Sequence, residues 1–270
     1  MKPKIVIASQ KGGVGKSTIS LNLAVAFAEL GYKTILVDAD PQGALNISLG
    51  KGHMEYPGLA ELFSEQEILS KLIITSKLPN LSLLTKGRLA MKNVPQFEKI
   101  MYQTPKLAEI VKQLEQQFDL IIFDSPAGLG MITRGLMKVA SHVLVPFKVD
   151  VFNLRSVNQI FQVVDAVQKD ENPELEFLGM ILNMFERSRD SDFNIAGEVW
   201  RKFPAIFETT IPTADIFREA GELGVPLAMI GKNKHPEARR FTYLAQEVIT
   251  RLNSSEEEEE GEARQVRHLL

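Results

Sequence analysis

The stretch Lys4–Thr18, KIVIASQKGGVGKST, constrains the fold of this chain more than any other part of it. It begins with a short apolar, β-branched run, Ile5 to Ala8, that is typical of a buried parallel strand. A glycine-rich turn follows, and apolar residues then recur at helical spacing from Leu21 to Leu30. Strand, glycine turn and helix in this order are the context of a loop that cradles phosphate. The sequence therefore predicts a phosphate-binding β-α unit at its start.

The residue types of the turn suit a nucleotide. Glycines let the backbone curl until several N–H groups converge on one anion, and the helix N-terminus behind them adds to the attraction. Lys16 would reach the β- and γ-phosphates, and the Ser17 hydroxyl would be placed for Mg²⁺. The usual pattern G-x-x-x-x-G-K-[ST] is not met strictly, because Gln10 replaces its first glycine and an additional lysine, Lys11, precedes the glycine pair. The alternative is a plain glycine-rich turn with two surface lysines.

Composition narrows the class of protein. A chain of 270 residues that is 44% hydrophobic and 24% charged is typical of a globular protein of one domain, or two, with a sizeable core. Cysteine is absent, which excludes disulfides, thiolate metal sites and a cysteine nucleophile. No apolar run approaches the roughly 18 residues of a membrane span, and the N-terminus lacks a signal-peptide pattern, so we expect a cytoplasmic location.

Charge is unevenly distributed along the chain. The segment 253–270 holds six glutamates against two arginines, whereas the remainder is close to neutral and no region is basic enough to indicate nucleic acid by itself. We expect a single domain over residues 1–252, followed by an acidic, disordered tail over 253–270. A solubilising role is the simplest interpretation of that tail.

Strand-length apolar runs alternate with segments of helical period after the first unit. This alternation predicts an α/β fold, a doubly wound and mostly parallel sheet flanked by helices on both faces. The segment 86–103 is expected to be loop or weak helix. We expect strands at 33–38, 71–74, 81–85, 118–124, 142–147, 177–184 and 206–211, and helices at 58–63, 106–117, 131–140, 157–167, 195–203, 216–222 and 236–252.

Three carboxylates follow predicted strands. Asp38 and Asp40 end the run TILVDAD, and Asp124 ends the run LIIFD. Ligands of doubly wound sheets bind beyond the carboxyl ends of the strands, where the glycine turn also falls. A nucleotide with Mg²⁺ needs a carboxylate near the metal and a group that orients the attacking water. Asp124 suits the metal role, and either of the others could supply the rest or merely cap a turn.

Three motifs, KGGVGKST, VDADPQG and FDLIIFDSPAG, together resemble the deviant Walker A, Walker A′ and Walker B motifs of the ParA/MinD family of P-loop ATPases. The resemblance extends over nearly the whole chain to about Leu252. It implies the P-loop NTPase fold with ATP and Mg²⁺ as ligands. It also implies that Lys11 reaches across an ATP-sandwiched homodimer to the partner's phosphates, while Lys16 holds the β- and γ-phosphates of its own nucleotide.

The same resemblance implies roles for the other motif residues. The loop residues that would line the phosphates are Gly12, Gly13, Val14, Gly15, Ser17 and Thr18, with Ser17 on Mg²⁺ and Thr18 at the α-phosphate. Asp40 would position or activate the water, and Asp38 and Asp124 would support the metal. Turnover is then expected to be slow and to rise with a partner.

The adenine end is less determined by the motifs. Asn183, which ends the run GMILN, resembles a family position that hydrogen-bonds the base, and Pro212 resembles the loop that lines it. The alternative for Asn183 is a simple strand-end cap.

The VDADPQG motif and the segment from Ile211 to Pro226 favour the ParA (Soj-like) branch, whose members position plasmids, chromosomes or protein cargo. That branch implies non-specific DNA binding by the ATP dimer, association with the nucleoid and a stimulating ParB-like adaptor. Thr213 stands where an arginine often follows the IP pair. The candidate DNA-binding residues are therefore Arg187, Arg189, Arg201, Lys202, Arg218, Arg239 and Arg240, for each of which ordinary surface charge is the alternative.

Other functions stay open beside this one. A MinD-like ATPase that cycles on a membrane would need a basic amphipathic C-terminal helix, whereas this chain ends in a glutamate run and ARQVRHLL. A biosynthetic P-loop enzyme that phosphorylates a small carboxylate would have no need of Lys11. A third possibility is an ATP-gated switch with negligible turnover.

Overall fold

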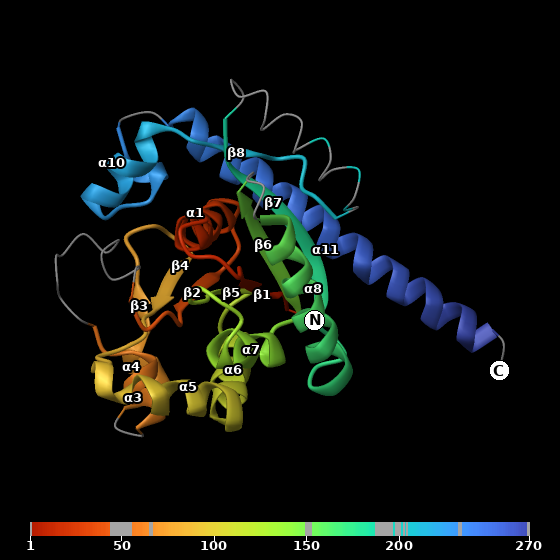
Figure 1. Ribbon diagram of the computed structural model, residues 1–270, viewed down its shortest axis with the longest axis horizontal. Helices are drawn as coiled ribbons and strands as arrows, with labels where there is room; N and C mark the ends of the chain where they lie inside the picture. Colours follow the sequence, from red (N-terminus) through yellow and green to blue (C-terminus); the bar gives the residue numbers. More distant parts are fainter. Residues whose placement is uncertain are drawn as a thin grey trace.

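The computed structural model describes residues 2–43, 56–64, 67–148, 153–186, 197, 201, 203, 205–231 and 234–268. Its centre is an eight-stranded sheet in the order β3-β4-β2-β5-β1-β6-β7-β8, drawn in Figure 1. Every neighbouring pair is parallel except β3 and β4. The strands are β1 (Lys4–Ile7), β2 (Thr34–Asp38), β3 (Ile74–Thr75), β4 (Leu81–Leu84), β5 (Leu120–Asp124), β6 (His142–Lys148), β7 (Glu176–Phe185) and β8 (Ile211–Pro212).

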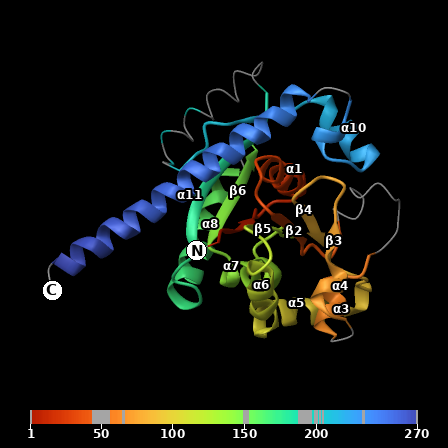
Figure 2. The ribbon, with the colours of Figure 1, turned by 180° about the vertical axis from the view of Figure 1, so that it is seen from behind.

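Helices cover both faces of the sheet, as Figures 1 and 2 show from opposite sides. One face packs under α1 (Lys16–Glu29), α10 (Asp215–Leu223) and α11 (Pro236–His268), with η2 (Leu227–Met229). The other carries α3 (Leu59–Phe63), α4 (Leu69–Leu72), α5 (Val94–Gln103), α6 (Lys106–Glu115), α7 (Met131–Val139) and α8 (Asn153–Asp170), with η1 (Met91–Asn93) before α5.

The central strands explain why the sheet needs two covers. Successive side chains alternate between faces, so Val37 joins the core under α3 to α8 whereas Leu36 joins the core under α1 and α11. Strands that are apolar on both faces are typical of a parallel sheet buried by helices. The predicted doubly wound α/β fold is confirmed.

Three predicted elements differ from the structure. Residues 69–72 form a helical turn and only Ile74–Thr75 pairs as a strand, while 94–103 is a complete helix whose second residue is Pro95, a residue suited to the first turn of a helix. The expected strand 206–211 is reduced to one bridge at Ile206 and to β8, because the N–H groups of Glu208 and Thr209 donate to the Glu247 carboxylate instead. The predicted helix 195–203 lies largely outside the described residues.

Helix α11 continues past Leu252 through the acidic segment to His268, where composition predicts disorder. Glutamate, alanine, arginine and glutamine are good helix formers, and elongating an existing helix avoids the cost of nucleation. Figure 1 shows this part of α11 extending beyond the sheet toward the C-terminus. None of the helices in the described ranges combines the length and the apolarity that crossing a membrane requires.

Candidate functional site

The glycine-rich turn connects β1 to α1 at the carboxyl edge of the sheet. Gly13 and Gly15 adopt left-handed backbone angles, with φ of 70° and 83°, and Gly15 is the N-cap of α1. The turn is held from behind, because the N–H of Gly128 donates to the Ser9 carbonyl (3.0 Å) and the N–H of Lys11 to the Ser9 hydroxyl (3.3 Å). The backbone of the turn is therefore fixed around the space that follows β1.

Lys16, the first residue of α1, is buried although its side chain ends in a charge. It is 7% exposed, and its Nζ lies 3.4 Å from the carbonyl oxygen of Lys11 at the other end of the turn. Burial lowers the pKa of Lys16, while the nearby carboxylates of Asp124 and Asp40 oppose that shift. The ammonium group thus sits inside the turn, where the motif places it. Ser17 is half-buried and Thr18 is exposed beside it.

Asp38 and Asp124 end the neighbouring strands β2 and β5 and pair directly in the parallel register. They are 1% and 0% exposed, and each has an Oδ2 atom that makes no hydrogen bond. Burial, then the proximity of Asp124, raises the pKa of Asp38 well above its usual range. Burial raises the pKa of Asp124 to about 6, against hydrogen bonds from Ser17 and Ser20 that lower it. Two adjacent buried carboxyl groups with unused oxygens are a costly arrangement without a cation.

This donor set fits Mg²⁺. The ion takes oxygen ligands, and in nucleotide sites one or two carboxylates share it with phosphate oxygens and water. The unpartnered Oδ2 atoms of Asp38 and Asp124 are ligands or water acceptors of that kind, and the Ser17 hydroxyl lies next to Asp124. Nowhere in the described part of the chain do three or more His, Cys, Asp or Glu side chains gather to hold a metal by themselves. The arrangement therefore suits an ion that is completed by a nucleotide.

Asp40 follows β2 in a tight turn. Its N–H donates to Asp38 Oδ1 (3.1 Å), its Oδ1 accepts the N–H of Gln42 (2.8 Å), and its carbonyl accepts the N–H of Gly43 (2.8 Å). Asp38 and Asp40 thus both cap this turn. Asp38 also keeps its Oδ2 atom without a hydrogen bond, so that atom can still act as a ligand. Lys11 is partly exposed at the start of the glycine turn.

Asn183 also belongs to this site, although it comes from β7. Its Nδ2 donates to the Val14 carbonyl at 2.7 Å, so its amide contacts the glycine turn rather than capping its own strand. Pro212 of β8 pairs beside it, opposite Phe185. Sequence reasoning missed Ser20, whose hydroxyl donates to Asp124 Oδ1 (2.9 Å) and to the Lys16 carbonyl (2.9 Å). Its position four residues after Lys16, on the same helix face, was the signal that could have identified it.

Of the candidate DNA-binding residues, the structure describes Arg201, Arg218, Arg239 and Arg240. Arg201, Arg218 and Arg239 are exposed, and Arg240 is partly buried. Arg201 donates to the Gly197 carbonyl (3.1 Å), Arg218 lies 3.5 Å from Asp215, and Arg240 donates to the Thr210 carbonyl (3.2 Å). Arg187, Arg189 and Lys202 fall outside the described residues.

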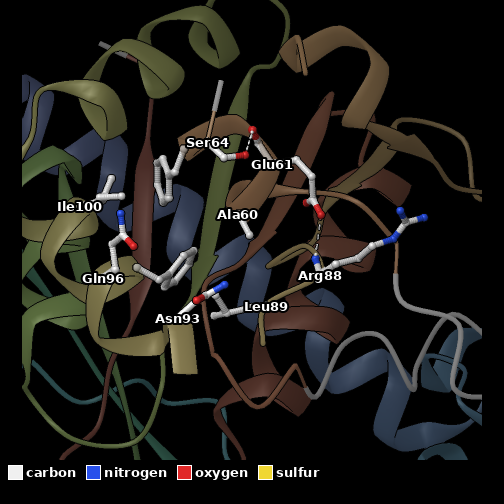
Figure 3. Close-up of a pocket in the computed structure, with 10 residues that line it drawn as sticks. Ala60, Glu61, Ser64, Arg88, Leu89, Asn93, Gln96 and Ile100 are labelled. Carbon is white, nitrogen blue, oxygen red and sulfur yellow. Dashed lines mark hydrogen bonds between the residues drawn. The ribbon is translucent and has the colours of Figure 1, made fainter. Parts of the chain in front are cut away.

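A separate pocket, drawn in Figure 3, lies between α3, the segment after β4 and α5. Its volume is about 240 Å³, and Glu61, Arg88 and Gln96 are among the residues that line it. That volume is below the roughly 300–1,000 Å³ of common small-molecule sites. None of its lining residues belongs to the glycine turn or to the carboxylate pair, so it is distinct from the phosphate site.

Comparisons with known proteins agree with this geometry. A protein-family model described as AAA domain matches residues 2–177. The chromosome partitioning protein ParA of Caulobacter vibrioides is 27% identical over 251 residues, which are 92% of this chain and 94% of that protein. The septum site-determining protein MinD from Pyrococcus horikoshii, complexed with Mg-ADP, superposes with a TM-score of 0.75 at 26% identity, covering 92% and 96% of the two chains.

A biosynthetic enzyme shares the fold as well. Cobyrinic acid a,c-diamide synthase from Mycobacterium smegmatis, with bound ADP and magnesium, superposes with a TM-score of 0.77, covering 94% of this chain and 97% of that one. At 23% identity this likeness shows the fold alone.

Proposed function

The chain belongs to the AAA domain family and, among P-loop ATPases, to the ParA/MinD group, and on this premise we propose that it is an ATP-dependent dimerising ATPase that positions DNA or protein cargo. One observation carries the proposal. Two buried carboxyl groups with unpartnered oxygens lie at the carboxyl edge of the sheet, where a buried lysine begins the helix behind a glycine turn. In such a site Mg²⁺ compensates the charge of the carboxylates, and the lysine with the N–H groups of the turn compensates the charge of the phosphates.

ATP and Mg²⁺ are the ligands of this site. The N–H groups of residues 12–18 and the Lys16 ammonium bind the phosphates, and Ser17 with the unpartnered oxygens of Asp38 and Asp124 holds Mg²⁺ directly or through water. When bound, the ion neutralises the charge that develops on the β- and γ-phosphate oxygens. The protein's own part is to keep these donors in place before the nucleotide arrives.

Hydrolysis in this proposal depends on a second copy of the chain. Asp40, held by the turn after β2, orients the attacking water, and Lys11 reaches the phosphates of the partner subunit's nucleotide. A lysine supplied from the other subunit ties turnover to dimerisation, and loss of the γ-phosphate removes part of the dimer interface. ATP therefore assembles the dimer and hydrolysis releases it. Turnover is slow until a partner protein of the ParB adaptor type stimulates it.

The ATP dimer binds DNA without sequence preference and so associates with the nucleoid. Exposed Arg201, Arg218 on α10 and Arg239 on α11 are the described candidates for these contacts. Phosphate contacts of this kind make binding fall steeply with salt concentration.

Sedimentation of an Asp40→Ala variant tests the proposal, because a dimer that cannot turn over accumulates. We expect a dimer with MgATP and a monomer with MgADP, and co-sedimentation of the ATP form with duplex DNA but not with anionic liposomes. The double variant Lys11→Ala, Asp40→Ala is the matched control and should stay monomeric. A protein that remains monomeric in saturating MgATP contradicts the proposal.

Sedimentation together with an assay of ATP turnover distinguishes the other three candidate functions. Co-sedimentation with liposomes alone would place the chain with membrane-cycling ATPases such as MinD. ATP turnover by the unsubstituted chain that requires an added small carboxylate would indicate a biosynthetic enzyme. Dimerisation without measurable turnover would indicate an ATP-gated switch.

A further inference from the structure

Asn183 joins two parts of the chain that are far apart in sequence. Its side chain is 4% exposed, and its Nδ2 donates to the Val14 carbonyl at 2.7 Å inside the glycine turn. Val14 is itself buried, so this carbonyl needs a protein partner. The side-chain amide of a residue on β7 thereby satisfies the Val14 carbonyl of the phosphate-binding turn.

The backbone of β7 is irregular at the next residue. Met184 has a φ of 54°, a left-handed conformation that is uncommon for a residue with a β-carbon. The pairing of β7 with β8 shifts register here, because Asn183 pairs with Ile211 and Phe185 with Pro212, which leaves Met184 as an extra residue. Such bulges bend a strand and re-aim a neighbouring side chain.

The turn is shaped to receive this amide. A β-carbon added at Gly15 would overlap Asn183 Nδ2, and its next neighbour would be the end of the Met184 side chain at 3.6 Å. Gly15 also has a φ of 83°, so both its conformation and its surroundings exclude a side chain. The glycine, the bulge and the amide thus form one interlocked unit.

We propose that Asn183 is a positioning residue of the phosphate-binding turn, aimed at the Val14 carbonyl by the bulge at Met184. The C=O and N–H of a trans peptide point in opposite directions. Holding the Val14 carbonyl toward β7 turns the N–H of Gly15 away from β7, into the turn where a phosphate would be bound. This role differs from a hydrogen bond to the adenine base. It rests on phosphate binding in the proposed function and is independent of dimerisation and DNA.

Ligands that differ only in the base distinguish the two roles. We would measure dissociation constants of MgATP, MgCTP and magnesium tripolyphosphate by displacement of a fluorescent ATP analogue from the wild-type chain and from Asn183→Ala. A positioning role predicts that all three weaken by the same factor, about tenfold, because the substitution leaves a buried carbonyl unsatisfied. If ATP weakens while CTP and tripolyphosphate keep their affinity, Asn183 reads the base and the proposal fails.

Two further variants guard against a folding artefact. Asn183→Asp keeps the size of the side chain but cannot donate to the carbonyl, so it should weaken the triphosphates together, as the alanine variant does. Met184→Gly frees the backbone at the bulge and leaves the amide group itself in place, so it should weaken all three ligands by a common factor that is smaller than the factor for Asn183→Ala. Unchanged affinities in Met184→Gly would contradict the part given to the bulge. Because every readout is binding to the isolated chain, a failure to dimerise leaves this test intact.

Discussion

The amino edge of the sheet, where its parallel strands begin, and the carboxyl edge, where they end, differ in how buried charges are compensated. At the amino edge, the Nζ of Lys4 lies 2.5 Å from Glu115 Oε1, and the N–H of Lys4 donates to the Ser141 hydroxyl at 2.8 Å. At the carboxyl edge, Asp38 and Asp124 lie side by side with unused oxygens, and the Lys16 ammonium approaches a backbone carbonyl at 3.4 Å. Strand β1 links the two arrangements, since Lys4 begins it and the turn before Lys16 ends it.

The difference separates a structural ion pair from a binding site. A buried charge costs free energy unless a partner compensates it, and the amino edge provides that partner from its own helix α6. The carboxyl edge instead brings like charges together, which folding alone does not favour. The ammonium groups of Lys16 and Lys86 compensate this charge only in part, because the pKa values of Asp124 and Asp38 both stay raised, and a bound cation would compensate the remainder. We therefore expect substitutions at the carboxyl edge to affect activity, and those at the amino edge to affect stability.

Lys16→Ala gives the largest expected effect. The ammonium is buried in the turn that would hold the β- and γ-phosphates, so its loss removes charge stabilisation that water cannot replace. We expect kcat/KM for ATP hydrolysis to fall by about 10³-fold, while the folded fraction measured by circular dichroism stays the same. If the variant keeps more than about a tenth of wild-type turnover, the carboxyl edge is not the catalytic site.

The pH dependence of stability provides the second test. The pKa of Asp124 is about 6 in the folded protein and near 3.8 in the unfolded chain, so the folded state binds more protons between these values. The contribution of Asp124 is present below about pH 4 and is lost as pH rises through 6. In EDTA and without nucleotide, it should change the free energy of unfolding by up to about 3 kcal/mol. Urea unfolding at several pH values measures it.

Asp124→Asn is the control for this pH effect, because asparagine has no carboxyl group to titrate. We expect the stability of wild type relative to the variant to decrease from pH 4 to pH 7. Burial raises the pKa of Asp38 in both proteins, whereas the part of that shift due to the Asp124 charge is lost in the variant, so the difference between the two proteins reports the coupled pair of carboxyl groups. A difference that is constant with pH would contradict the buried, uncompensated state of Asp124.

Lys4→Met tests the opposite edge. Removing the ammonium leaves Glu115 without its partner, but that carboxylate side chain is 29% exposed and can be hydrated. We therefore expect a loss of about 1–2 kcal/mol in the free energy of unfolding, less than for a fully buried pair. ATP turnover should stay within about twofold of wild type. The double variant Lys4→Met, Glu115→Gln should recover part of the stability, and a large loss of turnover in Lys4→Met would erase the contrast between the edges.

Much of the carboxyl edge could be predicted from sequence, because its parts are local. The glycine turn, Lys16, Asp38 and Asp124 each stand next to an apolar strand run, and parallel strands bring their carboxyl ends to one edge. The doubly wound fold followed from the same alternation of strand and helix periods. The motifs therefore predicted that these residues lie near one another on the sheet, although they did not predict the contacts between them.

The remainder depends on contacts between distant segments. The bond from Asn183 to Val14 spans 169 residues and needs a bulge that no local signal indicates. The expected strand near Ile206 was lost because Glu247 of α11 takes the neighbouring backbone donors. In both cases a tertiary partner overrode a local preference.

Truncation of the C-terminal helix α11 gives the smallest expected effect on stability. It tests how far along α11 the stabilising contacts of the amino edge extend. Among the residues of α11 whose burial the structure describes, up to Ser254, Leu252 is the last one in the hydrophobic core, and it lines a cavity of about 440 Å³ with Lys2 and Pro3. Removal of residues 255–270 should lower helical circular dichroism but shift the melting temperature by no more than about 2 °C, less than 1 kcal/mol for a chain of this size.

A cut after Leu244 is the matched control, because it also removes buried Val248 and Leu252. It takes away Arg251 as well, whose guanidinium donates to the carbonyls of Leu178, Ala205 and Ile206. This control should lose several kcal/mol, about 2–5 for each large core side chain removed. If removal of residues 255–270 were as destabilising as the cut after Leu244, the acidic part of α11 would itself stabilise the fold, and the stabilising contacts of α11 would extend beyond Leu252.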